Sequence, residues 1–499
     1  MIAVIVFSTQ CTAEPHKTSL EAKSVQNNKK EIDQKDLFNM IRNGVVAIKV
    51  RGHVIMERSF NDKMWTGTGF IVDLEKGLII TNSHVAGEMA VCTYEIKFGN
   101  GTKTEAKLEY IDPCYDMAVL SVDPKNIPKG SIALEMSDED ACVNTTVYSM
   151  GNSYGNEFST YQGTIFDIYS ILWLRVFPEQ SIQFSGLTVP GASGSPVFGC
   201  DGKVIGLLYG GKLVSGAALP IKYVKPVIAS IKKGEYFTRY FYGFMLDYMT
   251  LQDAVETGVV PEEWSLEYEK QFPDSNNKIL YVSKKLTAFS KEGETTFSQS
   301  KEVEAGDVIV SVDGVPIGCK LQKFDDIVQA AKGNSLSMKV YRRGKEKTIK
   351  IKTYELAGYK NMKLLSFAGC TFFETNDDVK VIKGTTEKAV YITNSEPGSP
   401  FMEVTSPNGE SIGHGLFRIN MIDNQKVSSL KDVVEILPNL MKKNVFTIRY
   451  TKTSGDGEET SVTTKYSPEF VEAMFYSFNE QTRTWEVSSI DNPSQIHRK

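Results

Sequence analysis

Short apolar runs separated by glycine, asparagine and aspartate turns fill residues 45–228 of this 499-residue chain. Residues 67–72 and 78–81 are two such runs, joined by a charged turn at 73–77. Runs of this length, rich in β-branched residues and bounded by turn residues, are typical of strands. Their regular spacing predicts a mainly β region built as two six-stranded barrels.

Helical patterns appear at both ends of this β-rich region. A short helix is predicted to open at residues 36–40, ahead of a first strand at 45–50. A closing helix is predicted over residues 222–234, because basic residues occupy its last turn and a glycine follows them.

Three segments carry residues suited to nucleophilic catalysis. Ser193 lies in a Gly-Ala-Ser-Gly-Ser-Pro turn, His84 follows the predicted strand 78–81, and Asp116 opens an apolar run at 117–122. A serine hydroxyl needs a base to take its proton, and the base needs a carboxylate that fixes its tautomer. The chain order His, Asp, Ser is one of the few known for this arrangement. We therefore expect His84, Asp116 and Ser193 to form a catalytic triad.

The residues around Ser193 suggest an oxyanion hole and exclude two alternatives. Gly191 permits a tight turn that aims the amides of Gly191 and Ser193, with Ala192 as a further candidate, at one point. Ser195 is a rival nucleophile, but it lacks the glycine two places before it. An α/β-hydrolase elbow does not fit, because its fifth position is not glycine and the order of Asp116 and His84 is wrong.

These motifs resemble those of the HtrA/Deg family, chymotrypsin-fold serine proteases followed by PDZ domains. The matching segments are Gly67-Thr68-Gly69-Phe70, Thr81-Asn82-Ser83-His84-Val85, Asp112-Pro113, Asp116-Met117-Ala118-Val119-Leu120, Gly191-Ala192-Ser193-Gly194, Asp201-Gly202-Lys203-Val204-Ile205-Gly206 and Ala218-Leu219-Pro220-Ile221. The resemblance covers residues 36–356 well and the rest more weakly. Ser195 stands where most members have a second glycine, a form that resembles the branch related to eukaryotic nuclear double-length Deg proteases.

The resemblance implies a fold and several further residues. It implies a chymotrypsin-like double β-barrel protease domain at 36–235, followed by two PDZ-like (α+β) domains at 236–356 and 357–466. It places Leu187 in the specificity pocket and implies cleavage after small aliphatic residues. It also implies a homotrimer or a multiple of one, and no cofactor.

The two PDZ-like segments differ in how closely they match the family. In the first, Tyr242, Gly243 and Phe244 resemble the loop that binds peptide C-termini, and residues 303–314 carry the most specific signature. A groove helix is expected at 324–331. The second has an expected helix at 430–437, but Gly415-Leu416-Phe417 replaces the Gly-Asp turn. It therefore either binds ligand or serves as a structural or assembly element.

The termini and the composition complete the domain prediction. Residues 1–13 resemble a cleaved signal peptide, which predicts a periplasmic or otherwise exported protein, with Cys11 as an alternative lipidation site. Residues 14–35 are expected to be a linker, and 467–499 a C-terminal extension that begins with a helix at 468–478.

Charge and cysteine content exclude several classes of partner. The net charge of −5 implies neither a nucleic-acid surface nor an anionic membrane surface, and no apolar stretch is long enough for an integral membrane segment. The histidines are scattered, so no metal site is expected. Six cysteines beyond Cys11 allow fifteen pairings, and the alternative is that most are buried thiols.

The sequence therefore predicts a serine endopeptidase that degrades unfolded or misfolded polypeptides in protein quality control and stress response. Its PDZ domains would bind peptide C-termini and regulate activity. Two alternatives stay open: a PDZ-based chaperone or scaffold with a dormant protease domain, and a processing peptidase with one dedicated substrate.

Overall fold

The computed structural model describes most of the chain between residues 33 and 490. The described residues are 33–55, 64–88, 90–153, 155–171, 180–186, 188–212, 214–285, 302–356, 362–374, 389–395, 398–405, 417–443, 445–452, 458–465, 473–479 and 482–490. The predicted signal peptide, the predicted linker up to residue 32, Cys11 and Leu187 lie outside them.

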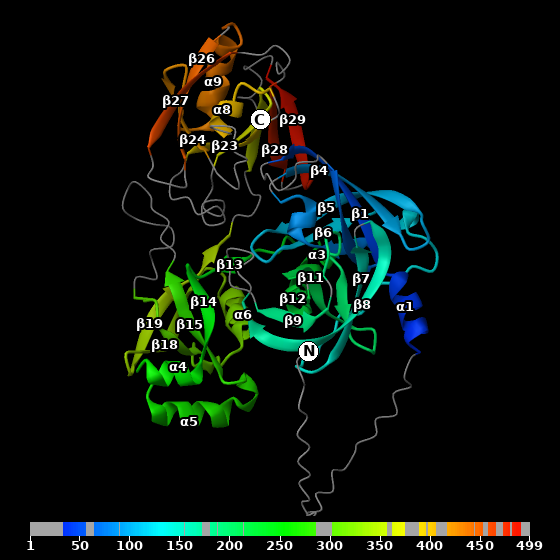
Figure 1. Ribbon diagram of the computed structural model, residues 1–499, viewed down its shortest axis with the longest axis vertical. Coiled ribbons are helices and arrows are strands. Elements are labelled where there is room, and N and C mark those ends of the chain that lie inside the picture. The colour runs from blue at the N-terminus through cyan, green and yellow to red at the C-terminus, as the bar shows by residue number, and fades with distance from the viewer. Residues whose placement is uncertain are drawn as a thin grey trace, which may run out of the picture.

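Two closed barrels of six strands each form the centre of the molecule, as the sequence predicts (Figure 1). Barrel 1 consists of β1 (Val45–Ile55), β2 (Met64–Asp73), β3 (Leu78–Thr81), β4 (Ala90–Phe98), β5 (Lys103–Asp112) and β6 (Met117–Ser121). Barrel 2 consists of β7 (Thr146–Ser153), β8 (Asn156–Ser170), β9 (Ser181–Ser185), β10 (Pro196–Phe198), β11 (Val204–Lys212) and β12 (Ser215–Pro220). This pair of barrels is the chymotrypsin-like fold.

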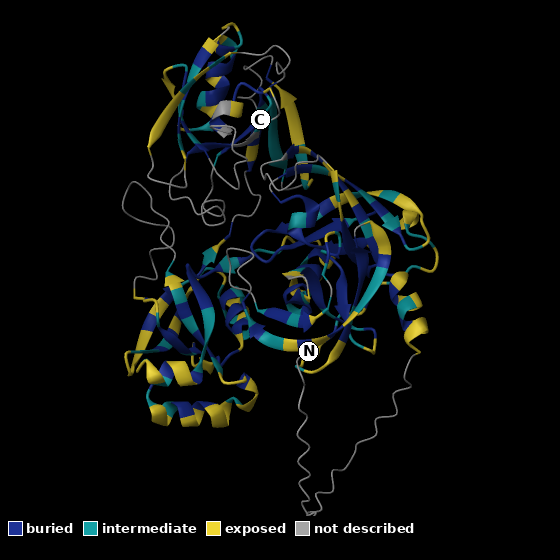
Figure 2. Cartoon of the chain, viewed as in Figure 1, coloured by how far each residue is buried: buried dark blue, intermediate teal, exposed yellow. Residues whose placement is uncertain are grey.

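Short helices border the barrels. α1 (Gln34–Arg42) precedes barrel 1, α2 (Ser83–Ala86) follows β3, and η1 (Pro124–Asn126) lies between the barrels in sequence. The predicted closing helix is present as η2 (Ile221–Tyr223) and α3 (Lys225–Lys232). Figure 2 shows that the inner strands of the barrels are almost entirely buried, and all four residues of β3 are. A fully buried strand of this kind appears in sequence as an unbroken apolar run.

A middle unit follows the barrels in sequence and packs beside barrel 2 (Figure 1). Its strands are β13 (Tyr240–Phe241), β14 (Phe244–Thr250), β15 (Lys278–Lys285), β16 (Val308–Val312), β17 (Val315–Pro316), β18 (Ser335–Arg342), β19 (Lys345–Lys352) and β20 (Tyr354–Glu355). Its helices are α4 (Leu251–Glu256), α5 (Glu262–Gln271), η3 (Pro273–Ser275) and α6 (Leu321–Ala331), the last of which includes the predicted groove helix.

A C-terminal unit repeats the same plan and packs on barrel 1 (Figure 1). Its strands are β21 (Lys363–Phe367), β22 (Cys370–Glu374), β23 (Val390–Ser395), β24 (Phe417–Ile422), β25 (Gln425–Lys426), β26 (Val445–Lys452), β27 (Glu459–Lys465), β28 (Met474–Asn479) and β29 (Thr484–Ser489). Its helices are α8 (Met402–Thr405) and α9 (Leu430–Leu440), and α9 contains the helix predicted at 430–437.

Sheet order shows the repetition and one difference. The order β14-β15-β16-β18-β19 in the middle unit corresponds to β22-β23-β24-β26-β27 in the C-terminal unit, with α6 and α9 at matching places. β14 lies at the end of its sheet. β22, by contrast, is paired on both sides, because β21 turns back on it and is itself paired with β28.

The prediction of a helix at 468–478 is wrong for residues 474–478, which the structure describes as part of a strand. Met474–Asn479 is strand β28, which pairs with β29 and β21. The apolar residues of this segment pack between the C-terminal unit and barrel 1, and Arg483 in the following turn forms an ion pair with Glu109 of β5. Pairing with strands elsewhere in the chain therefore overrides the local pattern.

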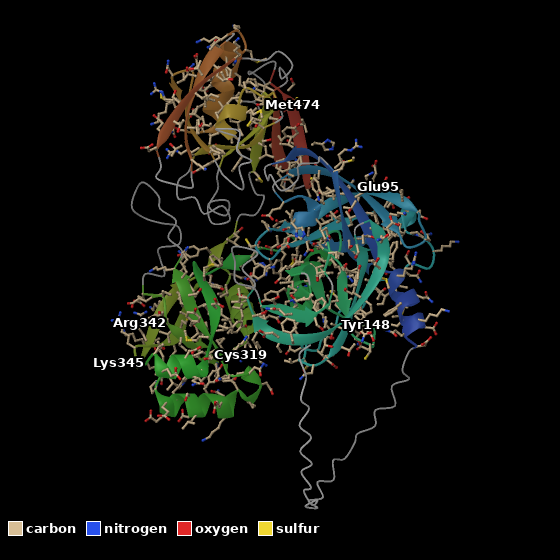
Figure 3. All side chains as sticks on the ribbon, viewed as in Figure 1. Glu95, Tyr148, Cys319, Arg342, Lys345 and Met474 are labelled. Atoms are coloured by element: carbon tan, nitrogen blue, oxygen red, sulfur yellow. The ribbon has the colours of Figure 1, made fainter. Side chains whose placement is uncertain are left out.

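A buried ion pair holds the signature turn of the middle unit. Arg342, labelled in Figure 3 at the end of β18, donates from Nε to Oδ1 of Asp307 over 2.6 Å and from Nη2 to Oδ2 over 2.7 Å. Asp307 is fully buried, and Gly306 before it has a φ of +92°. A bidentate pair of this geometry fixes the turn that starts β16.

The contact between the middle unit and barrel 2 passes through α6 and β14. Tyr223 Oη donates to Oδ2 of Asp325 in α6 over 2.9 Å, and the rings of Tyr169 and Tyr248 lie 6.0 Å apart. Burial, opposed by the Tyr223 hydrogen bond, raises the pKa of Asp325 to about 8. Asp325 is therefore mostly uncharged near neutral pH, which reduces the cost of burying it here.

Candidate active site

The antiparallel pairing of β3 with β6 brings His84 and Asp116 together. Thr81 pairs with Ala118, so the residues just beyond the ends of these strands face each other. Nδ1 of His84 lies 2.8 Å from Oδ2 and 3.0 Å from Oδ1 of Asp116. Because the carboxylate can only accept, Nδ1 is the donor, which leaves Nε2 as the basic nitrogen of a neutral imidazole.

Asp116 is held in place by its own neighbours. Oδ1 accepts from Ser83 Oγ over 3.0 Å and from the His84 amide over 3.1 Å, and Asn82 Nδ2 donates to the Asp116 carbonyl over 2.8 Å. Asp116 is 1% exposed and has a φ of +49°, a left-handed conformation that aspartate tolerates better than most residues. Hydrogen bonds from several sides hold a buried carboxylate in one orientation.

Hydrogen bonds to Asp112, and an ion pair with a residue outside barrel 1, hold the turn that leads to Asp116. Asp112 accepts from the amides of Cys114 and Tyr115 through Oδ1, over 3.1 and 3.2 Å. Its Oδ2 lies 2.9 Å from Nε and 2.8 Å from Nη2 of Arg239, which belongs to the segment connecting α3 to β13. Burial acts to lower the pKa of Arg239, but the Asp112 carboxylate outweighs it and holds the pKa above its usual value. An ion pair therefore joins the segment between α3 and β13, which leads into the middle unit, to the turn that precedes Asp116.

Replacing Arg239 with alanine is expected to lower the free energy of unfolding by about 3–5 kcal/mol, because it leaves the Asp112 carboxylate buried without its cation. Urea unfolding followed by circular dichroism measures the loss. Arg343→Ala is the matched control, since that side chain is 88% exposed and should change stability by less than about 0.5 kcal/mol. Equal stability of the two variants would show that the Asp112–Arg239 pair does not stabilise the fold.

The loop that carries Ser193 is bonded to both barrels. The Thr68 amide of β2 donates to the Ser193 carbonyl over 2.9 Å, and the Gly194 amide donates to the carbonyl of Leu208 in β11 over 2.8 Å. Gly194 has a φ of +88°, and a Cβ there would lie 1.9 Å from the Thr68 carbonyl oxygen and 2.5 Å from Thr81 Oγ1. The loop therefore approaches the end of the strand that precedes His84, and only glycine permits that approach.

Ser193 and its neighbouring amides are open in this conformation. Within the described residues, Ser193 Oγ makes no hydrogen bond with His84, and the Gly191 and Ser193 amides donate none. Catalytic hydrogen bonds are often long before substrate binds. The sequence also offers the Ala192 amide as an oxyanion donor, but in the structure this amide donates to the Val189 carbonyl over 3.1 Å. Gly191 and Ser193 thus offer two unengaged donors, and Ala192 does not offer a third.

Ser195 does not have the surroundings of a nucleophile. It is 1% exposed, and its Oγ donates to the Ala192 carbonyl over 2.6 Å. A buried hydroxyl that already donates to a carbonyl can neither meet substrate nor pass its proton to a base.

The remaining site predictions fall elsewhere in the molecule. Leu187 lies outside the described residues, so its role stays a prediction. Tyr242 and Phe244 are buried, and the Tyr242 ring packs edge-on against Phe324 of α6 at 4.8 Å. Gly243 between them has a φ of +81°. Phe244 is the first residue of β14 and the other two directly precede it, beside α6; in the part of the chain that the structure describes, β14 is an edge strand paired only with β15.

The metal-ligand residue types and the cysteines of the described ranges were the other candidates for chemistry. No group of three or more His, Cys, Asp or Glu side chains there could hold a metal ion. The six cysteines of these ranges are thiols, and burial raises the pKa of the Cys92 thiol to about 12. A thiol with so high a pKa is a poor nucleophile. No helix in the described part of the chain is long and apolar enough to cross a membrane.

The double barrel and the arrangement of His84, Asp116 and Ser193 define the class of a chymotrypsin-like serine peptidase domain. In agreement, residues 67–207 match the family of the trypsin-like peptidase domain. This part of the chain is similar to that domain, and most of the chain is similar to serine proteases.

Curated relatives cover most of the chain. It is 26% identical over 437 residues to the pro-apoptotic serine protease NMA111 of Candida glabrata, which covers 85% of this chain and 42% of the relative. It is 28% identical over 398 residues to the protein of the same name from Pyricularia oryzae, covering 77% of this chain and 36% of the relative. The chain thus spans less than half the length of these relatives.

Solved structures give a weaker likeness. The HtrA-type protease AlgW with a decapeptide is 20% identical, with a TM-score of 0.45, and covers 65% of this chain and 99% of that one. The serine endoprotease from Yersinia pestis is 21% identical with a TM-score of 0.40, covering 64% and 98%. The resemblance stated from the motifs is confirmed by the trypsin-like domain and the serine protease relatives.

Several residues of the site have no role that the sequence motifs predict. Thr68, Ser83 and Asp112 fall inside recognised motifs, but the motifs did not assign them a role. Arg239 carries no local signal, because its partner Asp112 lies 127 residues away in sequence.

Proposed function

We propose that this chain is a serine endopeptidase that cleaves unfolded or misfolded polypeptides. The proposal rests on the geometry of His84 and Asp116. The buried Asp116 carboxylate accepts a hydrogen bond from Nδ1 of His84 and is held by Ser83 Oγ and the His84 amide. The nearby loop that carries Ser193 has two backbone amides that donate no hydrogen bond among the described residues. This arrangement supplies a base, its orienting carboxylate, a nucleophile and oxyanion donors.

The reaction proceeds through an acyl-enzyme. His84 Nε2 takes the proton of Ser193 as its Oγ attacks the scissile carbonyl, and the carbonyl oxygen becomes an oxyanion bound by the amides of Gly191 and Ser193. Asp116 stabilises the imidazolium that forms. His84 then gives the proton to the leaving amine, and water attacks the acyl-enzyme with His84 again as base.

We extend the proposal to specificity and regulation. Leu187 lines the pocket and favours small aliphatic residues before the cleaved bond. The middle and C-terminal units are PDZ domains, and the first binds peptide C-termini by adding a strand to β14. The repeated sheet order supports this assignment. The C-terminal unit is a structural copy, because β21 occupies the edge of β22 where a peptide would add.

Contacts of the first PDZ domain suggest how it regulates activity. Two residues that border the proposed peptide site contact the protease part of the chain. Tyr248 of β14 packs against Tyr169 of β8, and Asp325 of α6 accepts from Tyr223 of η2. A peptide that binds there competes with these contacts. Export through residues 1–13 and assembly into a trimer complete the proposal and rest on the sequence alone.

The dormant-protease alternative is favoured by one observation. Ser193 Oγ is not hydrogen-bonded to His84 among the described residues, as in a resting enzyme that a ligand must activate. In that case the chain binds unfolded proteins without cleaving them.

Degradation of casein, an unfolded substrate, separates the two proposals. We expect the full chain to fragment casein, to spare a folded protein of similar size, and to lose activity after treatment with diisopropyl fluorophosphate. Peptides with hydrophobic C-termini should change the rate if the first PDZ domain regulates it. A folded preparation that leaves casein intact under all conditions but suppresses its aggregation would contradict the peptidase and support the chaperone.

A further inference from the structure

The hydroxyl of Ser195 has a specific partner inside the Ser193 loop. The Ala192 carbonyl accepts two hydrogen bonds from Ser195, one from Oγ over 2.6 Å and one from the amide over 3.0 Å. With glycine at this position only the amide bond would be possible. The hydroxyl therefore adds a second, buried anchor to one carbonyl of the loop.

That carbonyl belongs to the peptide group that provides an oxyanion donor. In a trans peptide the C=O and N–H bonds point in opposite directions and lie in one plane. Fixing the Ala192 carbonyl toward Ser195 therefore directs the Ser193 amide to the other side of the loop. Rotation of this peptide group would break both bonds from Ser195 and turn the Ser193 amide away.

The space for the hydroxyl is provided by a glycine on a neighbouring strand. A Cβ at Gly151 of β7 would lie 1.9 Å from Ser195 Oγ and 2.7 Å from Thr68 Oγ1. Thr68 Oγ1 in turn donates to the Gly191 carbonyl over 2.8 Å and accepts from the Asn152 amide over 2.9 Å. Two hydroxyls packed against Gly151 thus hold two successive carbonyls of the loop.

We propose that Ser195 is a positioning residue of the oxyanion hole, which fixes the Ser193 amide in its donating direction through the Ala192 carbonyl. Gly151 makes room for the hydroxyl, and Thr68 holds the preceding peptide group in the same way. This inference rests on the proposed peptidase function. It assigns a role to the serine that distinguishes this chain from family members with a second glycine.

The test compares Ser195→Ala and Ser195→Gly with the wild-type chain on one peptide substrate. We expect kcat to fall about tenfold, less than the 10²–10³-fold cost of removing an oxyanion donor outright. KM should stay unchanged, because the ground-state carbonyl depends little on this amide. Affinity for a peptide boronic acid, whose adduct with Ser193 is tetrahedral, should fall by a similar factor.

A matched control separates positioning from general stability. Ser265 of α5 is also buried, and its Oγ donates to the Glu262 carbonyl over 2.7 Å, far from the triad. Ser265→Ala should leave kcat, KM and boronic-acid affinity unchanged. Gly151→Ala, which displaces the Ser195 hydroxyl without removing it, should reproduce the loss of kcat in a variant that keeps the wild-type circular dichroism spectrum.

The outcomes separate this inference from the proposed function. An active wild type with unchanged kcat and boronic-acid affinity in Ser195→Ala would overturn the positioning role and leave the peptidase intact. A wild-type chain that neither cleaves peptide nor reacts with diisopropyl fluorophosphate would overturn the peptidase, and the positioning role with it.

Discussion

Ser193→Ala is expected to lower kcat for peptide cleavage by about a million-fold, the size of effect seen when a serine peptidase loses its nucleophile. Alanine has no oxygen to attack the scissile carbonyl, so no acyl-enzyme can form. The amides of Gly191 and Ser193 and the binding cleft remain, so a small residual acceleration should persist.

Casein degradation and the hydrolysis of a chromogenic peptide measure this loss. Ser159→Ala is a suitable control, because the hydroxyl of this half-buried serine donates to the carbonyl of Asn156 in the β7–β8 hairpin, so the variant should retain full activity. Retention of more than about 1% of wild-type activity by Ser193→Ala would place the nucleophile elsewhere, since a million-fold effect leaves far less.

Asp116→Asn is expected to lower kcat by about ten-thousand-fold while the fold is preserved. The carboxylate accepts from Ser83 Oγ, from the His84 amide and from His84 Nδ1. An asparagine must turn its NH₂ group toward one of these donors. If it faces the imidazole, His84 adopts the tautomer with the proton on Nε2 and cannot take the proton of Ser193.

Steady-state kinetics at neutral pH, with circular dichroism to verify folding, test this expectation. Asp123→Asn serves as the control, because the exposed Asp123 accepts from the Lys125 amide at the start of η1 and takes no part in the pair with His84. A drop of less than tenfold in Asp116→Asn would mean that His84 is oriented by something other than this carboxylate.

Much of the fold and the pairing of His84 with Asp116 could be predicted because their signals are local. The apolar run of β3 and the turns around it mark the strand at 78–81, and His84 follows it directly. The glycine pattern around Ser193 shows that the backbone must turn tightly there, which the positive φ of Gly191 and Gly194 bears out.

Features that depend on distant partners could not be predicted. The residues around Arg239 in the sequence do not indicate a role, because its partner Asp112 is brought to it only by the fold. The sequence predicts a helix at 468–478, and its local pattern does not show that the strand from Met474 pairs with β21, which lies more than a hundred residues earlier. Likewise, no sequence pattern shows that the Ala192 amide turns toward Val189 rather than into the oxyanion hole.

Mapping the adduct of a serine-directed fluorophosphonate on the full chain is the most direct test of the central claim. The reagent phosphonylates only an activated serine hydroxyl, and peptide mass spectrometry locates the modified residue. We expect one adduct, on Ser193, with labelling slowed strongly in Asp116→Asn. An adduct on Ser195, or no adduct on a folded protein, would contradict this expectation.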